Sequence, residues 1–369
     1  MGFRRRYRWP ASGPGLAEKH AMRLILVGEA NPGSRTPQRL AALRRLGHDV
    51  AMVPTTLSDW TYETRPGLLY RLAYHLRLPL DPAGANLALA DAATAGCDAV
   101  ILDNARMIRP STLRRVRMAA PQAKLIWYSE DDSMNAVHRS RWIEGCMPLF
   151  DLWVTTKSFN AEPGEVPSLG VHRVLFVDNS FCPHDHAPLA ITESERRQWG
   201  APVSFVGTFE AARAADLAAL AQADIEVRVW GNGWQSLRNS HPCLHIEGRP
   251  VYGEDYRRVV AASDLNLCFL RKGNRDRQTC RSLELPAMGA AMLHEASPEV
   301  ERLFHPDREA VYFADQASLI AAARHWLAAT PAREQLKQAA RRRAISDGHD
   351  HDSRWRFILA QAMEDTCAS

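Results

Sequence analysis

Short apolar runs alternate with amphipathic stretches through almost the whole chain. The first run, MRLILVG, occupies residues 22–28, and a stretch over residues 36–46 follows it with Leu40, Leu43 and Leu46 on one face. Apolar runs that are continuous, rather than interrupted by polar residues, are typical of parallel strands covered on both faces. Their alternation with helices predicts right-handed crossovers and a doubly wound α/β sheet.

The pattern forms two series separated by a polar segment. In the first series we expect further strands over residues 49–53, 99–103, 124–128, 152–156 and 173–177. In the second series we expect strands over residues 203–206, 225–230, 265–270 and 291–294, and helices over residues 211–220 and 256–262. The segment 182–202 contains three prolines and no strand pattern. We therefore predict two Rossmann-like sheets joined by one linker, with a cleft between them.

The length of 369 residues agrees with two domains of ordinary size. We expect a leader over residues 1–21, a first domain over 22–190, a second domain over 200–350 and a final segment over 351–369. Residues 353–363 of the final segment are amphipathic. A helix there either crosses back onto the first domain or packs on its own domain.

Residues 1–21 differ from the rest because they are basic and have no apolar run. They lack the apolar core of a signal peptide, so we interpret them as a disordered leader, with Met22 as an alternative start. A contact with the anionic inner face of a membrane through the arginines at positions 4, 5, 6 and 8 is one alternative. A solvated tail is the other.

Composition narrows the class of protein without giving an activity. A net charge of +4 is too small to indicate a nucleic-acid partner. The seven cysteines form no C-x-x-C pair, which is typical of a reducing cytoplasm and not of a zinc or disulfide framework. No run reaches the roughly 18 apolar residues of a membrane span. We expect a cytoplasmic protein.

Candidate ligand-binding residues follow the strands, because open α/β sheets bind ligands beyond the carboxyl ends of their strands. Gly207 and Thr208 come after the strand 203–206 and before a helix, where free backbone N–H groups suit an anion. An ordinary strand-to-helix turn is the alternative.

A second loop of this kind contains Gly231, Gly233 and Trp234 after the strand 225–230. The glycines allow the backbone to approach a flat ligand, and the indole offers a face for stacking a base. A simple turn with a buried tryptophan is the alternative.

The segment 271–295 contains the densest group of charged candidates. Arginines crowd the loop after the strand 265–270, beside the start of a helix, where a diphosphate would need them. Asp276 and Glu284 are too far apart to lie on one helical face, so we place Asp276 in the loop and Glu284 on the helix.

The sequence RSLELPAMG over residues 281–289 resembles the nucleotide-binding helix of the group-1 glycosyltransferases. It is most similar to the branch typified by the spore-maturation, CgeB-like proteins. Asp276 and Glu284 resemble the E-x7-E motif of that superfamily, with Asp in place of the first Glu. The sequences YGEDY over residues 252–256 and WYSEDD over residues 127–132 also fit this branch.

This resemblance implies a GT-B fold, with two Rossmann-like parallel-sheet domains facing each other across a cleft. It implies retaining hexosyl transfer, without a bound metal, from UDP-sugar or a related nucleotide sugar, as in polysaccharide biosynthesis. The acceptor would be a glycan, a lipid-linked molecule or a protein, bound mainly by the first domain. Residue by residue, Glu284 would bind the ribose, Arg281 and Ser282 would lie near the phosphates with Arg277 as a further candidate, and Asp276 would face the donor sugar.

The first domain offers fewer candidates. The loop over residues 28–34 has G-x4-G-S spacing but no lysine, so we interpret it as a cleft-lining loop and not as a P-loop. Asp132, near His138, is a candidate base or acceptor-orienting carboxylate after the strand 124–128, and Asp103 is a weaker one. A helix N-cap formed by Asp132 or Ser133 is the alternative.

Two histidine pairs do not predict a metal site. His184 and His186 lie in the linker, and His349 and His351 precede the last helix. Histidines two positions apart in a loop are more often solvated. For the last helix we expect an N-cap at residue 352 or 353.

Two other functions on the same architecture remain open. A nucleotide-sugar epimerase of the GT-B type would need an acid and a base around the sugar in place of an acceptor channel. An inactive nucleotide-sugar-binding relative is the second alternative, because Asp276 departs from the motif. An NAD dehydrogenase is the least favoured alternative, because no G-x-G-x-x-G follows either first strand.

Overall fold

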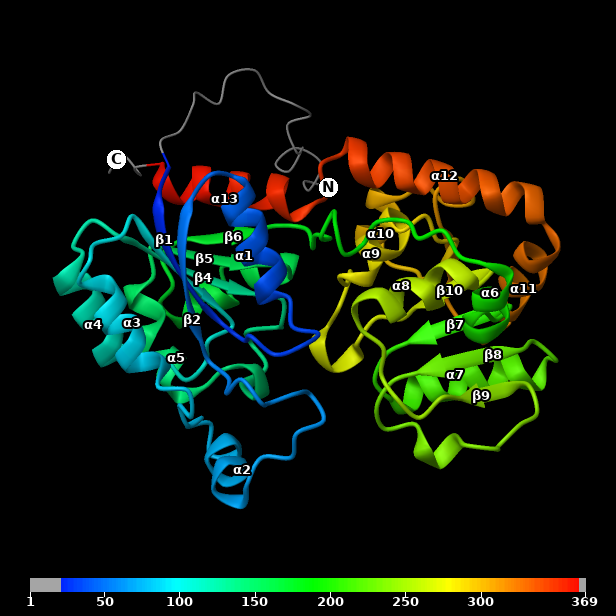
Figure 1. Cartoon of the computed structure of the whole chain (residues 1–369), viewed down its shortest axis with the longest axis horizontal. Coiled ribbons are helices and arrows are strands. Elements are labelled where there is room, and N and C mark those ends of the chain that lie inside the picture. The colour runs from blue at the N-terminus through cyan, green and yellow to red at the C-terminus, as the bar shows by residue number, and fades with distance from the viewer. Residues whose placement is uncertain (1–20, 365–369) are drawn as a thin grey trace.

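The computed structural model describes residues 21–364, which form two α/β domains side by side (Figure 1). All but the last residue of the expected basic leader lies outside this range. Each domain contains one six-stranded parallel sheet with helices on both faces. The prediction of two doubly wound parallel sheets is therefore confirmed.

The first sheet has the strand order β2-β1-β3-β4-β5-β6. Its strands are β1 (Arg23–Gly28), β2 (Asp49–Pro54), β3 (Ala99–Asp103), β4 (Lys124–Ser129), β5 (Leu152–Thr155) and β6 (Val174–Phe176). β1 is buried from its second residue onward and β3 along its whole length, because helices cover both faces of the central strands.

The second sheet has the strand order β12-β11-β10-β7-β8-β9. Its strands are β7 (Val203–Val206), β8 (Val227–Trp230), β9 (Leu244–Ile246), β10 (Leu265–Cys268), β11 (Met292–Glu295) and β12 (Val311–Phe313). The sequence analysis missed β9 and β12. Both are edge strands of three residues, too short to give a recognisable run of apolar positions.

The helices fill the crossovers. Those of the first domain are α1 (Thr36–Arg45), α2 (Leu68–His75), α3 (Ala85–Ala93), α4 (Pro110–Ala119) and α5 (Arg141–Cys146). Those that follow are α6 (Glu193–Trp199), α7 (Ala211–Gln222), α8 (Gly253–Ala262), α9 (Arg281–Ala287), α10 (Pro298–Leu303), α11 (Gln316–Ala328), α12 (Thr330–Ser346) and α13 (His351–Met363). Short 3-10 turns lie at Ala136–His138, Met147–Leu149, Ser158–Ala161, Val166–Leu169, Gln235–Leu237 and Lys272–Asn274.

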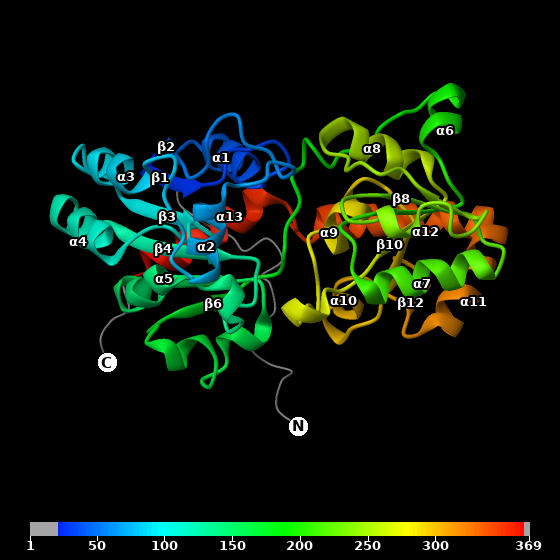
Figure 2. The ribbon, with the colours of Figure 1, turned by 90° about the horizontal axis from the view of Figure 1, so that it is seen from below.

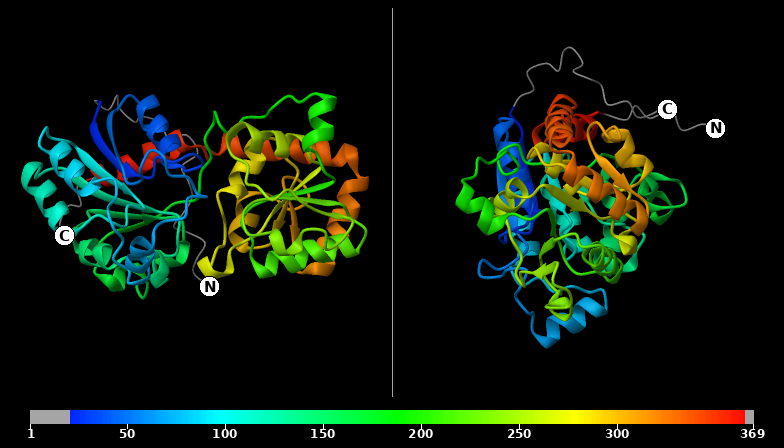
Figure 3. Two further views of the ribbon diagram at one scale, coloured as in Figure 1. Left: turned by 60° about the horizontal axis from the view of Figure 1, so that its bottom comes forward. Right: turned by 90° about the vertical axis from the view of Figure 1, so that its right-hand side faces the viewer.

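Successive residues of each central strand pack on opposite faces of the sheet. In β1, Ile25 and Val27 face a core that contains α3 and α4, whereas Leu24 and Leu26 face a core that contains α1 and α13. The second sheet is likewise covered by α7 and α11 on one face and by α8, α9 and α10 on the other. The two layered domains are seen from below in Figure 2 and from two further sides in Figure 3.

The last helix, α13, belongs to the core of the first domain. After α12 the chain crosses from the second domain to the first, and α13 packs on α1 and β4 (Figure 1). Trp355 is 1% exposed and lies 5.3 Å from the ring of Tyr128, measured between ring centroids. Arg45 of α1 forms an ion pair with Asp352 at the start of α13.

The segment between the sheets contains a helix that the sequence analysis did not expect. α6 begins with a capping box, in which the Thr192 hydroxyl accepts from the backbone N–H of Glu195, and the Glu195 carboxylate accepts from that of Thr192. Trp199 at its end is buried against the second domain. Within residues 21–364, no helix is long and apolar enough to cross a membrane.

Candidate active site

A cavity of about 760 Å³ lies between the two sheets. One wall comes from the segments that follow β1, β3, β4 and β5, and the other from the segments that follow β7 and β10 and from the start of α9. The carboxyl ends of both sheets therefore meet at this cavity, which is where open α/β folds bind ligands. Its lining consists mainly of charged side chains.

Two arginines of the second domain line the cavity, and their guanidinium groups have N–H donors that no acidic side chain of the described residues accepts. Arg213 of α7 is 8% exposed, and its Nη2 lies 3.0 Å from Glu210. Burial lowers the pKa of Arg213, and the positive charge of Arg281 lowers it further, although Glu210 opposes both. Arg281 forms no ion pair or hydrogen bond with the described part of the chain, and its buried Nε is unsatisfied. Two neighbouring cations with spare donors suit a dianionic group such as a diphosphate.

The sequence analysis found Arg281 but missed Arg213. Arg213 lies two residues inside a helix whose other residues are mostly alanine and leucine, so it was indistinguishable from a solvated surface residue. The position of Arg213 could have indicated its role, because α7 starts directly after the loop that follows β7 and Arg213 lies in its first turn. Gly207 and Thr208 form that loop, and Thr208 lines the cavity beside Arg213, whose Nη1 donates to the Thr208 carbonyl at 3.0 Å.

The wall formed by the first domain is a fixed network of charges. The Nη1 of Arg39 donates to Asp103 at 2.7 Å, and its Nη2 donates to Glu130. Burial would raise the pKa of Glu130, but Arg39 and Arg35 outweigh it and hold the pKa at about 2. This carboxylate is therefore ionised at neutral pH and orients the two arginines. Asp103 is committed to the same network.

One carboxylate in the cavity forms no direct ion pair with a described residue, although the charge of Arg106 acts on it. Glu29, directly after β1, accepts a hydrogen bond from the Tyr62 hydroxyl at 3.1 Å. Burial raises its pKa. A carboxylate of raised pKa beside a cavity is suited to proton transfer. The sequence analysis expected the loop 28–34 to line a cleft, and Glu29 and Ser34 do so, but it did not select Glu29.

Asp276 and Lys157 form a buried ion pair across the two domains. Lys157 Nζ lies 2.6 Å from Asp276 Oδ1, and each side chain is 3% exposed. Asn274 also donates to Asp276, at 2.8 Å. Asp276 lies in the loop before α9, as expected, and both members of the pair line the cavity. A lysine from the other domain thus neutralises this carboxylate at the wall of the cavity.

Glu284 lies on α9, one turn from Arg281, but the first domain covers it. Its carboxylate accepts from Arg35 at 3.2 Å and from the Tyr256 hydroxyl at 3.3 Å, and it lies 3.9 Å from His186 Nε2. Burial would raise its pKa, but the charges of Arg35 and His186 lower it below the ordinary value. Glu284 is not part of the cavity lining. A ribose would reach it where Arg35 lies now.

Ser282 is buried beneath the cavity and not beside it. Its hydroxyl is 2.7 Å from His294 Nε2 and accepts from the backbone N–H of Thr279 at 2.9 Å. The residue is fully buried. The structure therefore gives Ser282 a role in shaping the start of α9, because its hydroxyl is already used within the domain.

Asp132 does not face the cavity. Its two oxygens accept from Arg275 at 2.6 and 2.9 Å, and Asn160 donates to it at 2.9 Å. The side chain is 3% exposed. The candidate base of the sequence analysis is instead an ion-pair residue between the domains, and its Oδ1 also accepts from the backbone N–H of Met134.

Arg277 points away from the cavity as well. Its guanidinium carbon lies 5.2 Å from the centroid of the Phe159 ring, and Nη1 donates to Ser158. The side chain is half-exposed, and it is absent from the cavity lining. The structure therefore does not bring Arg277 into the cavity that Arg213 and Arg281 line.

Trp234 is a core residue and offers no face to a ligand. It is 0% exposed, packs edge-on against Phe205 and Phe209, and donates from Nε1 to the Gly207 carbonyl at 2.7 Å. Of the two interpretations of this loop from the sequence, base stacking and a turn with a buried tryptophan, the structure agrees with the second. Gly231 allows the backbone to pass close to Gly207 in this turn, because a Cβ at position 231 would lie 1.9 Å from the Gly207 oxygen.

The Trp234→Phe variant should therefore affect stability and not nucleotide binding. It removes one buried hydrogen bond and part of an indole, so we expect a loss of about 1–3 kcal/mol in the free energy of unfolding. Nucleotide affinity should stay within about twofold of wild type. Chemical denaturation and calorimetric titration with UDP measure the two quantities. A tenfold loss of affinity without loss of stability would restore the stacking interpretation.

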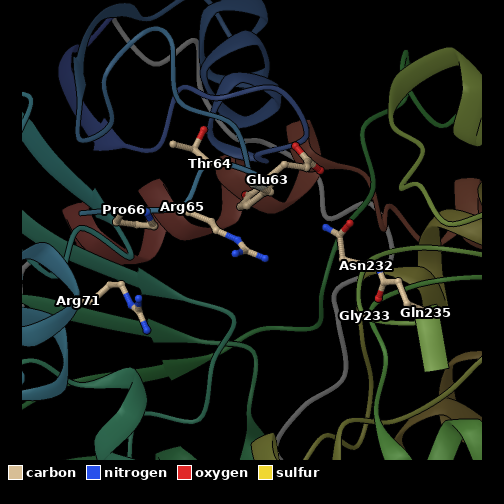
Figure 4. A pocket seen from close by; sticks show the side chains of 9 residues that line it. Glu63, Thr64, Arg65, Pro66, Arg71, Asn232, Gly233 and Gln235 are labelled. Atoms are coloured by element: carbon tan, nitrogen blue, oxygen red, sulfur yellow. The ribbon is translucent and has the colours of Figure 1, made fainter. Parts of the chain in front are cut away.

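Gly233 lies at the mouth of a second cavity, of about 620 Å³ (Figure 4). Tyr62, Arg65 and Arg71 of the first domain line it, opposite Asn232 and Gly233. Tyr62 also lines the cavity between the sheets, so the two spaces adjoin. Of the site residues predicted from the sequence, Thr208, Asp276 and Arg281 line the larger cavity and Gly233 lines the smaller one. We take the larger as the active-site cavity.

Three of the four histidines, His186, His349 and His351, are buried and not solvated as expected, whereas His184 is exposed. His186 accepts from the backbone N–H of Cys182 at 2.9 Å, and His351 lies 2.7 Å from the Ser180 hydroxyl. His349 is 5% exposed. Over residues 21–364 no three His, Cys, Asp or Glu side chains come together as a metal site would require. The N-cap of α13 is Asp350 and not residue 352 or 353, so the helix begins slightly earlier than expected.

Two Rossmann-like parallel-sheet domains with a cleft between their strand ends, and a last helix that returns to the first domain, define the GT-B fold. Residues 212–360 match the family model described as "Glycosyl transferase-like", which is less than half of the chain. No curated protein sequence matches the chain.

Several solved structures share this fold at low sequence identity. HepE of Anabaena, in complex with UDP-glucose, has 12% identity and a TM-score of 0.61, over 92% of this chain and 100% of that one. An α-glucosyltransferase in complex with UDP and DNA has 13% identity and a TM-score of 0.61, over 94% and 100%. A putative UDP-N-acetylglucosamine 2-epimerase from Listeria monocytogenes has 12% identity and a TM-score of 0.58, over 92% and 95%.

Proposed function

We propose that the protein is a glycosyltransferase that moves a hexosyl group from a nucleoside-diphosphate sugar to an acceptor bound by the first domain. The observation that carries the proposal is the pairing of Arg213 with Arg281 in a cavity between two Rossmann-like sheets. Two converging guanidinium groups with spare donors are suited to a diphosphate. The glycosyltransferase-like match over residues 212–360 covers this half of the site.

One arrangement of the donor uses the side chains described above, in and beside the cavity. The diphosphate lies between Arg213 and Arg281, the sugar lies toward Asp276, and the ribose reaches Glu284 once Arg35 moves. Charge on the departing diphosphate is taken up by the arginines, so the proposed transfer is metal-independent. Glu29 is the carboxylate best placed to accept a proton from the acceptor hydroxyl.

We propose the donor from the ligands that are bound in the similar solved structures. HepE and the α-glucosyltransferase are described with UDP or UDP-glucose, so UDP-sugar is the first donor to test. The retaining stereochemistry, the CgeB-like branch, a role in polysaccharide biosynthesis and a cytoplasmic location remain predictions from the sequence.

The test of this function is stabilisation by UDP. Millimolar UDP should raise the melting temperature of the wild type, because a ligand that binds only the folded state stabilises it in proportion to the logarithm of its concentration over Kd. The Glu284→Ala variant should lose most of this shift. The matched control is Arg35→Met, which removes the same ion pair but keeps the carboxylate and should keep the shift. No shift with UDP, GDP or any nucleotide sugar would overturn the proposal.

A nucleotide-sugar epimerase is the second candidate, since one structural relative is described as a putative 2-epimerase. Such an enzyme acts on the donor alone and needs an acid and a base around the sugar. Conversion of UDP-sugar to its epimer in the absence of any acceptor would favour it. Slow hydrolysis of the donor without epimerisation would favour transfer, and it would also argue against an inactive binding protein.

A further inference from the structure

The first domain exposes an apolar surface that its own core does not use. Leu68, Leu69 and Leu72 of α2 and Leu76 directly after it are 80%, 71%, 54% and 52% exposed. At about 100° per residue these four positions fall within roughly 100° of the helix circumference. We call them the α2 stripe. Contiguous exposed leucines of this kind mark a docking surface.

The helix is held to the domain by its other side. Only Ala73 of α2 is buried. Tyr70 packs edge-on against Trp60 at 5.2 Å between ring centroids, and Arg106 donates to the Tyr74 hydroxyl at 3.2 Å. α2 projects from the lower end of the first domain in Figure 1. The stripe is therefore presented on a fixed element and is not a frayed end of the chain.

Cationic side chains border the stripe on one side. Arg71 and His75 lie on the flank of α2 next to Leu68 and Leu72, and Arg65 comes just before the helix. The side chains of Arg65 and Arg71 form no ion pair or hydrogen bond with any described residue, and both residues line the second cavity. Figure 4 shows them with their guanidinium groups in the open space of that cavity.

The stripe is continuous with the active site. Arg71 belongs both to α2 and to the second cavity, and Tyr62 belongs to that cavity and to the one between the sheets. A molecule held at the stripe by an apolar tail thus has a route along unpaired arginines to Glu29, which the Tyr62 hydroxyl contacts.

We propose that the α2 stripe docks on the surface of an anionic bilayer, and that the acceptor of the glycosyl transfer is a lipid-anchored molecule whose anionic head group enters through the cavity of Arg65 and Arg71. The second statement rests on the proposed function, and the first does not. A short helix with leucines on one face and cations at its border has the pattern of interfacial helices. Arginines attract anionic head groups and favour a membrane over a second copy of this chain, which would bring the same cations together.

The test is co-sedimentation of the full-length protein with vesicles of phosphatidylglycerol and phosphatidylethanolamine. The variant Leu68→Ser/Leu72→Ser should bind these vesicles at least tenfold more weakly than the wild type, because both side chains lose their apolar contact with the bilayer. The matched control is Met118→Ser on α4, whose side chain is 81% exposed and outside the stripe. It should bind as the wild type does. Vesicles of phosphatidylcholine alone should bind the wild type weakly.

Each other outcome overturns the proposal. Equal binding by the stripe variant and the wild type would place the membrane contact elsewhere, for example on the arginines near position 5. Absence of vesicle binding together with dimerisation that the stripe variant abolishes would make the stripe a contact between copies. The stabilisation by UDP is measured on the same variants and should be unchanged, so failure of the docking is distinguished from failure of the donor site.

Discussion

The Arg281→Ala variant is expected to bind UDP about 100-fold more weakly than the wild type, because each charge-assisted hydrogen bond to a phosphate contributes roughly 1.5–3 kcal/mol. Its guanidinium has no partner in the described residues, and its positive charge lowers the pKa of buried Arg213. The free protein should therefore keep its stability or gain some when this charge is removed. Titration calorimetry measures the affinity, and thermal unfolding without ligand measures the stability.

The control for this variant is Arg277→Ala. Arg277 is four positions earlier in the same segment, but its side chain lies against Phe159 outside the cavity. We expect its UDP affinity to stay within about threefold of the wild type. If Arg277→Ala lost the affinity and Arg281→Ala kept it, the assignment of the phosphate site would be wrong.

A second large effect is expected from Lys157→Met, which should destabilise the fold by about 3–5 kcal/mol. Removing Lys157 leaves the Asp276 carboxylate buried at 3% exposure without its cation, and only the Asn274 amide and the backbone N–H of Arg271 still donate to it. The double variant Lys157→Met/Asp276→Leu should recover most of the loss, because a buried pair replaced on both sides leaves no uncompensated charge. Chemical denaturation of the single and double variants measures both values.

Lys337→Met is the matched surface control. Lys337 pairs with Glu334 at 2.9 Å, but Glu334 is half-exposed, and such pairs contribute about 0–1 kcal/mol. Comparable losses from Lys157→Met and Lys337→Met would contradict the view that the pair between the domains is buried and essential. A double variant as unstable as the single one would show that packing, and not the unpaired charge, causes the loss.

Much of the fold could be predicted because its strands carry their signal locally. β1, β3, β4 and β5 are buried on both faces, so they appear in the sequence as continuous apolar runs. β9 and β12 are three-residue edge strands and α6 is a short helix in a polar segment, so none of them has a window long enough to show a period.

The active-site cavity could be predicted only in part, because half of its interactions join residues far apart in sequence. The helix that begins at Arg281 has a recognisable sequence. Arg213 contributes to the same cavity only through the packing of α7 on β8 and β9, which no local pattern reveals. Asp132 was a reasonable candidate by its place after β4, but its partner Arg275 is in the other domain.

The arrangement of α13 also sets an order of events during synthesis. Trp355, Ile358 and Leu359 are part of the same core as the first strand of the chain, which leaves the ribosome more than three hundred residues earlier. The second domain contains all of its own strands and helices before α13 is made. The domain that is translated first is therefore the one that is completed last, and a nascent chain that ends before residue 351 has only α1 to cover that face of its first sheet.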